Sequence, residues 1–250
     1  MTKTTLLILP GLLEDADGFA HQVAGLAEVA DVLVADLTRS DTIAGLASDA
    51  LAQVREGTFA LAGHSMGGYV ALELMRLVPG RVERLALLNT NARPDSPEST
   101  ENRRRLVALA ERDFDAAVAT LLEKQLSPAH LADPALTATI SQMARSVGRE
   151  AFARQQKAIM GRADSRPGLA RIACPTLVVA GRDDAIMPVA LLQELAEGIP
   201  GARLEVIDEC GHAAMLEHPE AVTDALHLWL TGEPRHGPDV VAGTRSPAPT

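Results

Sequence analysis

The chain has 250 residues, a length that suits a single α/β domain. Hydrophobic residues make up 47% and charged residues 22%, which is typical of a globular protein with a sizeable core. The formal net charge of −10 argues against a nucleic-acid partner, because binding to phosphates needs clustered Lys and Arg. Neither a secretory signal nor a membrane-length apolar stretch is found. We therefore expect a cytoplasmic protein, monomeric or homodimeric, that does not bind membranes.

Short apolar runs alternate with helical patterns along most of the chain. Most of the runs are continuously apolar, as expected for parallel strands that are buried on both faces. The alternation predicts a doubly wound, parallel six-stranded sheet. The expected strands are Thr4–Leu9, Asp31–Asp36, Phe59–Ala62, Val82–Leu88, Thr176–Ala180 and Arg203–Ile207. The expected helices between them are Gly18–Glu28, Thr42–Arg55, Met66–Leu77, Val189–Gly198 and Pro219–Leu230.

Residues 93–168 interrupt this alternation, because they contain helical patterns and no convincing strand. We interpret them as a helical unit inserted after the fourth strand, with residues 1–92 and 169–230 forming the core. Residues 231–250 are rich in Pro and Gly and are predicted to form a tail. The run Arg103-Arg104-Arg105 is interpreted as a solvated helix face, with contact to an anionic substrate or partner as the alternative.

The two cysteines are expected to be free thiols. Cys174 precedes the fifth predicted strand and Cys210 follows the sixth. In neighbouring parallel strands these positions differ by a strand length of about 17–20 Å. Because a disulfide needs Cα atoms within about 7 Å, we expect no bridge and a reducing compartment.

The stretch "GHSMGG", Gly63 to Gly68, contains the pattern G-x-S-x-G between a predicted strand and a predicted helix. A tight strand-to-helix turn brings Gly63 and Gly67 close to neighbouring backbone, where a Cβ atom would clash. The turn forces Ser65 into a strained conformation that exposes its hydroxyl group at the edge of the sheet. The pattern therefore predicts Ser65 as a nucleophile, against the alternative of a Gly-rich turn with an incidental serine.

A serine nucleophile needs a base, and His212 is the best candidate among the seven histidines. It lies in "DECGHAAMLEHP", just beyond the last predicted strand, where parallel sheets place ligand sites. His64 adjoins the serine but is expected to point away from it and to pack. The remaining histidines are interpreted as surface or packing residues: His21, His130, His218, His227 and His236.

The base in turn needs an anion that holds its tautomer. Asp183 and Asp184 follow the fifth predicted strand in "VVAGRDDAIMP", at the same edge of the sheet. Either aspartate could instead cap the helix after Pro188, and we expect Asp183 to do so. The chain order Ser65, Asp184, His212 is the Ser…Asp…His order of hydrolases with this kind of sheet.

Taken together, these segments resemble the α/β-hydrolase superfamily, in particular small capped serine esterases and enol-lactonases. The resemblance runs from "LLILPG" to "HLWL". "GHSMGG" matches the nucleophile turn, "GRDDAIMP" the acid loop and "CGHAAMLEHP" the histidine loop. In the family the acid stands four residues before the proline, which implies Asp184. The resemblance also implies that the inserted helices are a cap over the serine.

The loop "ILPGLLEDADGF" is similar to the oxyanion loop of the family, with Pro10-Gly11 where relatives usually have His-Gly. The resemblance implies that the backbone N–H groups of Leu12 and Met66 form the oxyanion hole, with Leu13 as the alternative to Leu12. Relatives usually begin with a β-hairpin before the first strand. This chain is expected to lack it.

The leading hypothesis is a serine hydrolase that cleaves a small carboxylic ester or lactone and needs no metal or organic cofactor. Two alternatives keep the same triad and change the bond: C–C bond hydrolysis and cofactor-free perhydrolysis. A third alternative, from another class, is a non-catalytic ligand-binding protein on this scaffold. Haloalkane dehalogenation is disfavoured, since it needs a carboxylate where Ser65 stands.

Overall fold

The computed structural model describes residues 3–233. From residue 234 onward, the predicted tail lies outside the described residues. The described chain contains a six-stranded, entirely parallel sheet in the order β2-β1-β3-β4-β5-β6. Its strands are β1 (Thr4–Leu9), β2 (Ala30–Val34), β3 (Phe59–His64), β4 (Val82–Leu88), β5 (Thr176–Gly181) and β6 (Arg203–Ile207). The predicted doubly wound sheet is thus confirmed.

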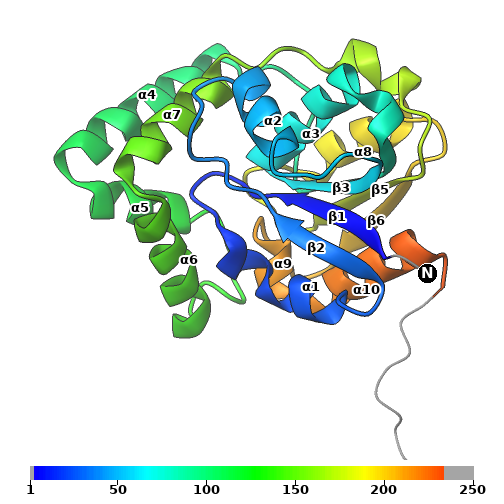
Figure 1. Ribbon diagram of the computed structural model, residues 1–250. Helices are drawn as coiled ribbons and strands as arrows, with labels where there is room; N and C mark the ends of the chain where they lie inside the picture. Colours follow the sequence, from blue (N-terminus) through cyan, green and yellow to red (C-terminus); the bar gives the residue numbers. More distant parts are fainter. Residues whose placement is uncertain (1–2, 234–250) are drawn as a thin grey trace, which may run out of the picture.

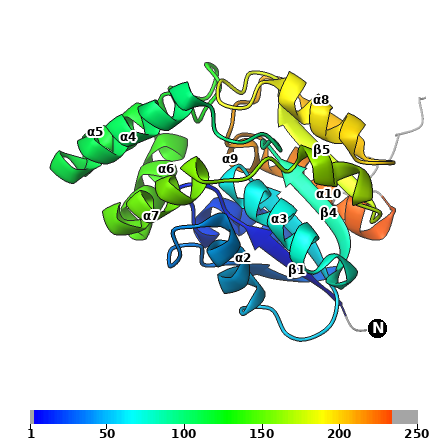
Figure 2. The same ribbon diagram turned by 90° about the horizontal axis from the view of Figure 1, so that it is seen from above.

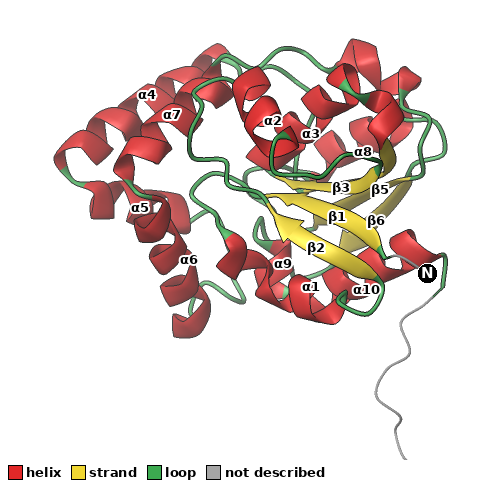
Figure 3. Cartoon of the chain, in the orientation of Figure 1, coloured by secondary structure: helices red, strands yellow, loops and turns green. Residues whose placement is uncertain are grey.

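Helices cover both faces of the sheet (Figures 1 and 3). Alternate residues of each strand point to opposite faces, so the apolar runs supply two separate cores. Leu7 and Leu9 of β1 belong to the core that contains α2 (Ile43–Leu51), α3 (Met66–Leu77) and α8 (Val189–Gly198). Leu6 and Ile8 belong to the core on the other face, with residues of α9 (Ala214–Glu217) and α10 (Pro219–Thr231). Phe19 and Leu26, which flank α1 (Ala20–Gly25), pack in the same core.

The first predicted helix differs most from the structure. In place of one helix over Gly18–Glu28, a 3-10 helix covers Ala16–Phe19 and α1 covers Ala20–Gly25. The side chain of Asp15 accepts a hydrogen bond from the N–H of Asp17, which starts the tighter turn two residues early. The periodicity of apolar residues located the helical segment but not its change of helix type.

Four helices separate β4 from β5: α4 (Pro97–Arg112), α5 (Phe114–Leu122), α6 (Pro134–Val147) and α7 (Arg149–Met160). They lie beside the carboxyl edge of the sheet, outside the two layers that cover its faces (Figure 2). Ser96, Asp113 and Asp133 each cap the start of a helix by accepting a backbone N–H. Ala117 and Phe152 pack in a third apolar cluster that also contains Leu13 of the loop after β1.

The three consecutive arginines of α4 do not share one environment. Arg104 and Arg105 are exposed and pair with Glu101 on their own helix. Arg103 points inward and donates hydrogen bonds to Asp95 and Gln156. The interpretation as a solvated face is therefore wrong for Arg103, since helical periodicity turns it away from its two neighbours.

Cys174 precedes β5 and Cys210 follows β6, and both are free thiols, as predicted. Burial raises the pKa of the Cys174 thiol. Burial raises the pKa of Cys210 as well, and the nearby carboxylates of Glu217 and Asp184 raise it further. Within residues 3–233, no helix is both long and apolar enough to cross a membrane.

The turn from β3 into α3 depends on glycine. A Cβ atom at Gly67 would lie 2.0 Å from the carbonyl oxygen of Leu9, at the end of β1. A Cβ atom at Gly63 would lie 2.4 Å from the carbonyl oxygen of Gly67. Both neighbours are backbone atoms, which cannot move aside without shifting a strand or a helix. The predicted reason for the two glycines of G-x-S-x-G is thus confirmed.

We expect Gly67→Ala to lower the free energy of unfolding by about 3 kcal/mol or more, because the new methyl group overlaps with backbone. The matched control is Gly80→Ala, since a Cβ atom at Gly80 meets no heavy atom within 4 Å. That control is expected to leave stability unchanged or to raise it by up to about 1 kcal/mol. Urea unfolding of both variants measures the difference, and equal stabilities would contradict the close approach.

Candidate active site

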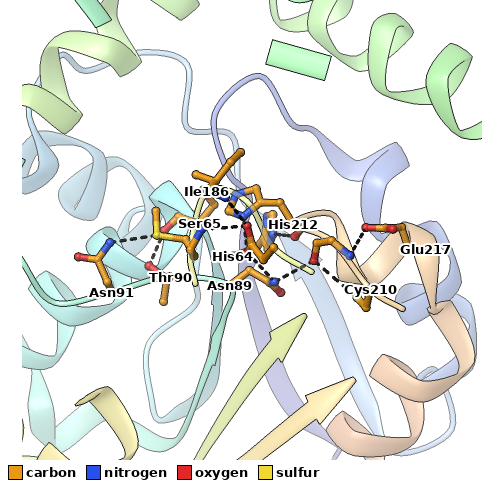
Figure 4. Close-up of polar contacts among 12 residues, drawn as sticks. His64, Ser65, Asn89, Thr90, Asn91, Ile186, Cys210, His212 and Glu217 are labelled. Carbon is orange, nitrogen blue, oxygen red and sulfur yellow. Dashed lines mark hydrogen bonds and ion pairs between the residues drawn. The ribbon is translucent and has the colours of Figure 1, made fainter. Parts of the chain in front are cut away.

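Ser65 lies at the sharp turn between β3 and α3 with φ 50° and ψ −114°. A positive φ is costly for a residue with a side chain, so this backbone is held by its surroundings. The N–H of Ser65 donates to the carbonyl oxygen of Leu88, and its own carbonyl oxygen accepts from Thr90 Oγ1 at 2.7 Å. These contacts with the end of β4 hold the serine side chain at the carboxyl edge of the sheet (Figure 4).

The structure brings Ser65, His212 and Asp184 together from three distant parts of the chain. Nε2 of His212 lies 2.8 Å from Oγ of Ser65, and Nδ1 of His212 lies 2.8 Å from Oδ2 of Asp184. His212 and Asp184 are buried, whereas Ser65 is partly exposed. A hydrogen-bonded chain therefore runs from an accessible hydroxyl group through an imidazole to a buried carboxylate. In this arrangement the imidazole can take the hydroxyl proton while the carboxylate holds its tautomer.

Asp184 is held as an anion by four hydrogen bonds. Its Oδ1 accepts the N–H groups of Ile186 and Met187, each at 2.8 Å. Its Oδ2 accepts from His212 and from Nδ2 of Asn89 at 2.9 Å. Burial on its own raises the pKa of the Asp184 carboxyl, but His212 and the other donors outweigh burial, so the pKa is lowered.

Sequence reasoning missed Asn89, which immediately follows β4 and has φ 45°. Its Nδ2 donates to Asp184 and also to the carbonyl oxygen of Gly211, beside the histidine (Figure 4). Asn89 therefore connects the acid loop to the histidine loop. The available signal was a polar residue at the carboxyl end of a buried strand, the position at which parallel sheets place their sites.

Asp183 does not cap the helix after Pro188, so that expectation is wrong. The N-cap of α8 is Pro188 itself, with no side-chain hydrogen bond. The loop that contains Asp183 is fixed by its backbone, since the N–H of Asp183 donates to the carbonyl oxygen of Cys210. The pattern of acidic residues before a helix could not distinguish a cap from a loop contact between strands.

The loop after β1 approaches the serine turn as expected. Its two candidate oxyanion-hole donors, the N–H groups of Leu12 and Leu13, differ in whether a protein acceptor already occupies them. The N–H of Leu13 donates to Oε1 of Gln155 on α7 at 3.1 Å, so this group is already occupied. Within residues 3–233, the N–H groups of Leu12 and Met66 have no protein acceptor. Leu13 also has φ 60°, a strained conformation that the contact with Gln155 supports.

The inserted helices also hold the histidine loop. The carbonyl oxygen of Gln125, which follows α5, accepts the N–H groups of His212 and Ala213 at 3.0 and 2.9 Å. Glu217 is buried, and its carboxylate accepts the N–H groups of Gly211 and Ser127. The segment that follows α5 thus helps to position the His212 imidazole. No motif in the sequence indicated this contact.

The other histidines lie outside this hydrogen-bonded chain. His21 contacts Thr223 and Glu220, and His130 contacts Ser127 and Glu217. His218 and His227 contact backbone carbonyl groups. His236 lies outside the described residues.

His64 is buried as predicted, but its ring makes two polar contacts, with Glu14 and with the carbonyl oxygen of His212.

The comparisons with known proteins agree with this fold. The model of the alpha/beta hydrolase family matches residues 6–225. The chain therefore belongs to the alpha/beta hydrolase family. A pimeloyl-[acyl-carrier protein] methyl ester esterase from Aromatoleum aromaticum is 32% identical over 187 residues, which cover 69% of this chain and 74% of that protein.

Two solved structures extend the likeness to almost the whole chain. A thermophilic esterase from Thermogutta terrifontis, solved with malate bound, has a TM-score of 0.86 and 32% identity, covering 92% of this chain and 90% of that one. An enol-lactonase from Burkholderia xenovorans has a TM-score of 0.82 and 28% identity, covering 92% of each chain. Both values indicate the same arrangement of sheet and helices.

The lowered pKa of Asp184 predicts an acid-dependent loss of stability. Its contribution is complete above the unfolded pKa of about 3.9 and is lost as the pH falls through the lower folded pKa. We expect Asp184→Asn to weaken this dependence, measured by urea unfolding between about pH 6 and pH 3. Asp183→Asn, which removes an exposed carboxylate next to it, should retain the dependence of the parent protein. Identical pH dependences for both variants would contradict the prediction.

Proposed function

We propose that this chain is a serine hydrolase that cleaves a small carboxylic ester or lactone through an acyl-enzyme on Ser65. Membership of a family whose matched relatives include esterases and an enol-lactonase makes it a carboxylic ester hydrolase. The observation that carries the mechanism is the chain of two 2.8 Å contacts from Ser65 through His212 to Asp184. In this proposal, these three residues form the catalytic triad.

Each group in the chain has a defined chemical role in this scheme. His212 Nε2 takes the proton of Ser65 Oγ as that oxygen attacks the substrate carbonyl carbon. Asp184 holds the Nδ1–H tautomer and stabilises the imidazolium. The imidazolium then protonates the leaving alcohol, and water, activated by the same histidine, releases the acyl group. Acyl transfer by this route needs no metal or organic cofactor.

We assign the oxyanion hole to the N–H groups of Leu12 and Met66. The occupied N–H of Leu13 favours Leu12 over its neighbour. Met66 is the first residue of α3, so its N–H has no intrahelical partner and the positive end of the helix dipole lies beside it. One donor of this kind typically contributes about 3–4 kcal/mol to the stability of the transition state.

Residues 93–168 are proposed to act as the cap, with residues 1–92 and 169–230 as the hydrolase core. A pocket lies between the loop after β1, helices α5 and α6, and the segment that follows His212. Its walls are mostly aliphatic, including Leu12, Val118, Ile140 and Met143. It leaves about 20 Å³ free, room for about one water molecule, so a bound group must displace flexible side chains. We infer that the enzyme prefers a short, uncharged acyl or alkyl group.

The proposed nucleophile is tested by Ser65→Ala. We expect turnover of p-nitrophenyl acetate or butyrate by the purified protein to fall by about 10⁴-fold or more, because no other group replaces the serine oxygen. Ser48→Ala is the matched control, since its exposed hydroxyl group contacts only the carbonyl oxygen of Ala44 on α2. Unchanged turnover in Ser65→Ala would refute the acyl-enzyme. Tight binding of esters without turnover in the parent protein would favour the non-catalytic alternative.

The pocket predicts a preference for short chains. In a series of p-nitrophenyl esters from acetate to octanoate, we expect kcat/KM to be highest for the short acyl groups. Met143→Ala removes a flexible side chain from the pocket wall and should shift the optimum toward longer chains, by about 10-fold in the ratio of kcat/KM values for the two ends of the series. An unchanged profile would place the acyl group elsewhere. Including diketones and peracid formation in the panel tests the C–C hydrolase and perhydrolase alternatives.

A further inference from the structure

A buried pair of charged side chains, Glu14 and His64, lies beside the proposed triad but is not part of it. Glu14 comes from the loop after β1, and His64 is the last residue of β3, directly before Ser65. Nδ1 of His64 lies 2.9 Å from Oε2 of Glu14, and Nε2 of His64 lies 2.9 Å from the carbonyl oxygen of His212. The side chains of His64 and Glu14 are 0% and 6% exposed, so water does not replace either contact.

These contacts determine where the protons of the His64 ring lie. A carbonyl oxygen can only accept a hydrogen bond, so Nε2 must carry a hydrogen atom. With Glu14 present as a carboxylate, which also only accepts, Nδ1 must carry a hydrogen atom as well. His64 is therefore an imidazolium paired with the Glu14 carboxylate.

The charges around His64 agree with this state. Burial lowers the pKa of His64, but the carboxylate of Glu14, its hydrogen bond and the carbonyl group of His212 outweigh burial, so the pKa is raised. Asp184 also raises it from the side of the triad. The remaining ring neighbours are Phe19, whose centroid is 6.4 Å away, and the His212 ring at 5.0 Å.

The pair connects three segments that the proposed reaction must keep in register. Oε2 of Glu14 also accepts the N–H of Gly11 at 2.6 Å, which fixes the loop just before Leu12. His64 is adjacent to the nucleophile, and its Nε2–H holds the backbone of the proposed base. One chain of hydrogen bonds thus runs from Gly11 through Glu14 and His64 to His212.

We propose that Glu14 and His64 are positioning residues that align the Leu12 N–H and the His212 imidazole with Ser65. This inference rests on the proposed function. Neither residue touches the reacting atoms in this scheme, although Glu14 also lines the pocket proposed for the acyl or alkyl group. Their effect comes from geometry, because a displacement of about 1 Å in a catalytic group is enough to lower the rate by about 100-fold.

A purely structural role makes a different prediction. A buried ion pair contributes little net stability, and removing one partner destabilises the fold wherever the pair lies. Such a loss would reduce the amount of folded enzyme and leave kcat per folded molecule and its pH dependence unchanged. If the two residues have a positioning role, replacing either one lowers kcat itself. In the parent protein, kcat then also depends on His64 being protonated, because its second hydrogen bond needs the second ring proton.

The test compares Glu14→Gln and His64→Gln with the parent protein on p-nitrophenyl butyrate. Glu14→Gln keeps an acceptor oxygen but removes the negative charge that stabilises the His64 imidazolium. His64→Gln replaces a ring that donates at both ends by one amide nitrogen, which cannot reach both acceptors. We expect kcat per folded molecule to fall by about 10–100-fold, with KM changed by no more than about threefold. The folded fraction is measured by circular dichroism at the assay temperature. His21→Gln is the matched control, since His21 pairs with Glu220 on the surface away from the site.

The pH profile adds a readout that folding alone does not change. Above its folded pKa, His64 loses one hydrogen and with it one of its two bonds, so kcat and stability of the parent protein are expected to decline at alkaline pH. In Glu14→Gln the carboxylate that raises this pKa is absent, and the decline should move to lower pH. Unchanged kcat and pH profiles in both variants, or a loss fully explained by unfolding, would overturn the proposal.

A measurement on the parent protein keeps the proposal testable even where a variant does not fold. Nitrogen-15 NMR of the histidines should show both ring nitrogens of His64 protonated at about pH 7, above the usual histidine pKa of about 6.5. A neutral His64 ring under these conditions would overturn it. Ser65→Ala in the p-nitrophenyl butyrate assay separates failure of the proposed function from failure of this inference. Turnover that survives Ser65→Ala refutes the proposed function, whereas turnover that depends on Ser65 but not on Glu14 or His64 refutes this inference alone.

Discussion

The close approach of two backbone segments at the carboxyl edge of the sheet is the constraint on which the site depends. At Gly67 the first turn of α3 lies against the end of β1, with no room for a side chain. The same approach puts the loop after β1 beside Ser65 and bends the backbone of Ser65 to a positive φ. The proposed nucleophile, a helix N-terminus and a loop of candidate N–H donors thus meet because two glycines have no Cβ.

The polar groups around this turn form a connected network, most of which is satisfied. Asp184 accepts four hydrogen bonds, and Asn89 connects it to the histidine loop. Within residues 3–233, Oδ1 of Asn89 is among the few buried side-chain atoms without a hydrogen-bond partner. Burying polar groups is unfavourable unless they are paired, so a network of this density at one edge of an otherwise apolar core supports the proposed catalytic role.

The helices between β4 and β5 do more than lie over the site. Gln155 on α7 holds the N–H of Leu13 and donates to the carbonyl oxygen of Leu37, so it joins the loops after β1 and β2. Gln125 and Ser127, which follow α5, contact the histidine loop directly or through Glu217. Substitutions in this insertion can therefore change the alignment of the proposed triad as well as the shape of the pocket. In the proposed scheme, the same segment combines substrate selection with support of the triad.

The sequence by itself determined the order of strands and helices along the chain and the parallel sheet. It also identified Ser65, Asp184 and His212 as residues that meet at the edge of that sheet. Buried parallel strands require continuous apolar runs, and a tight strand-to-helix turn requires glycines at particular positions, so both leave local signals. Periodicity and capping patterns were weaker guides, because one pattern is compatible with several structures. An acidic residue before a helix, as at Asp183, can cap the helix or lie in a loop. Periodicity alone did not predict the inward position of Arg103 or the 3-10 turn before the first helix.

Only the tertiary structure decided which groups support the site. Asn89, Glu14, His64 and Gln155 each act on residues far away in the chain, with separations of up to 148 residues. The contact between Gln155 and the N–H of Leu13 supports Leu12, which the family resemblance already implied, over the alternative Leu13. A hydrogen bond depends on distances of a few tenths of an ångström between atoms that folding brings together, and no local pattern of residues encodes such a distance.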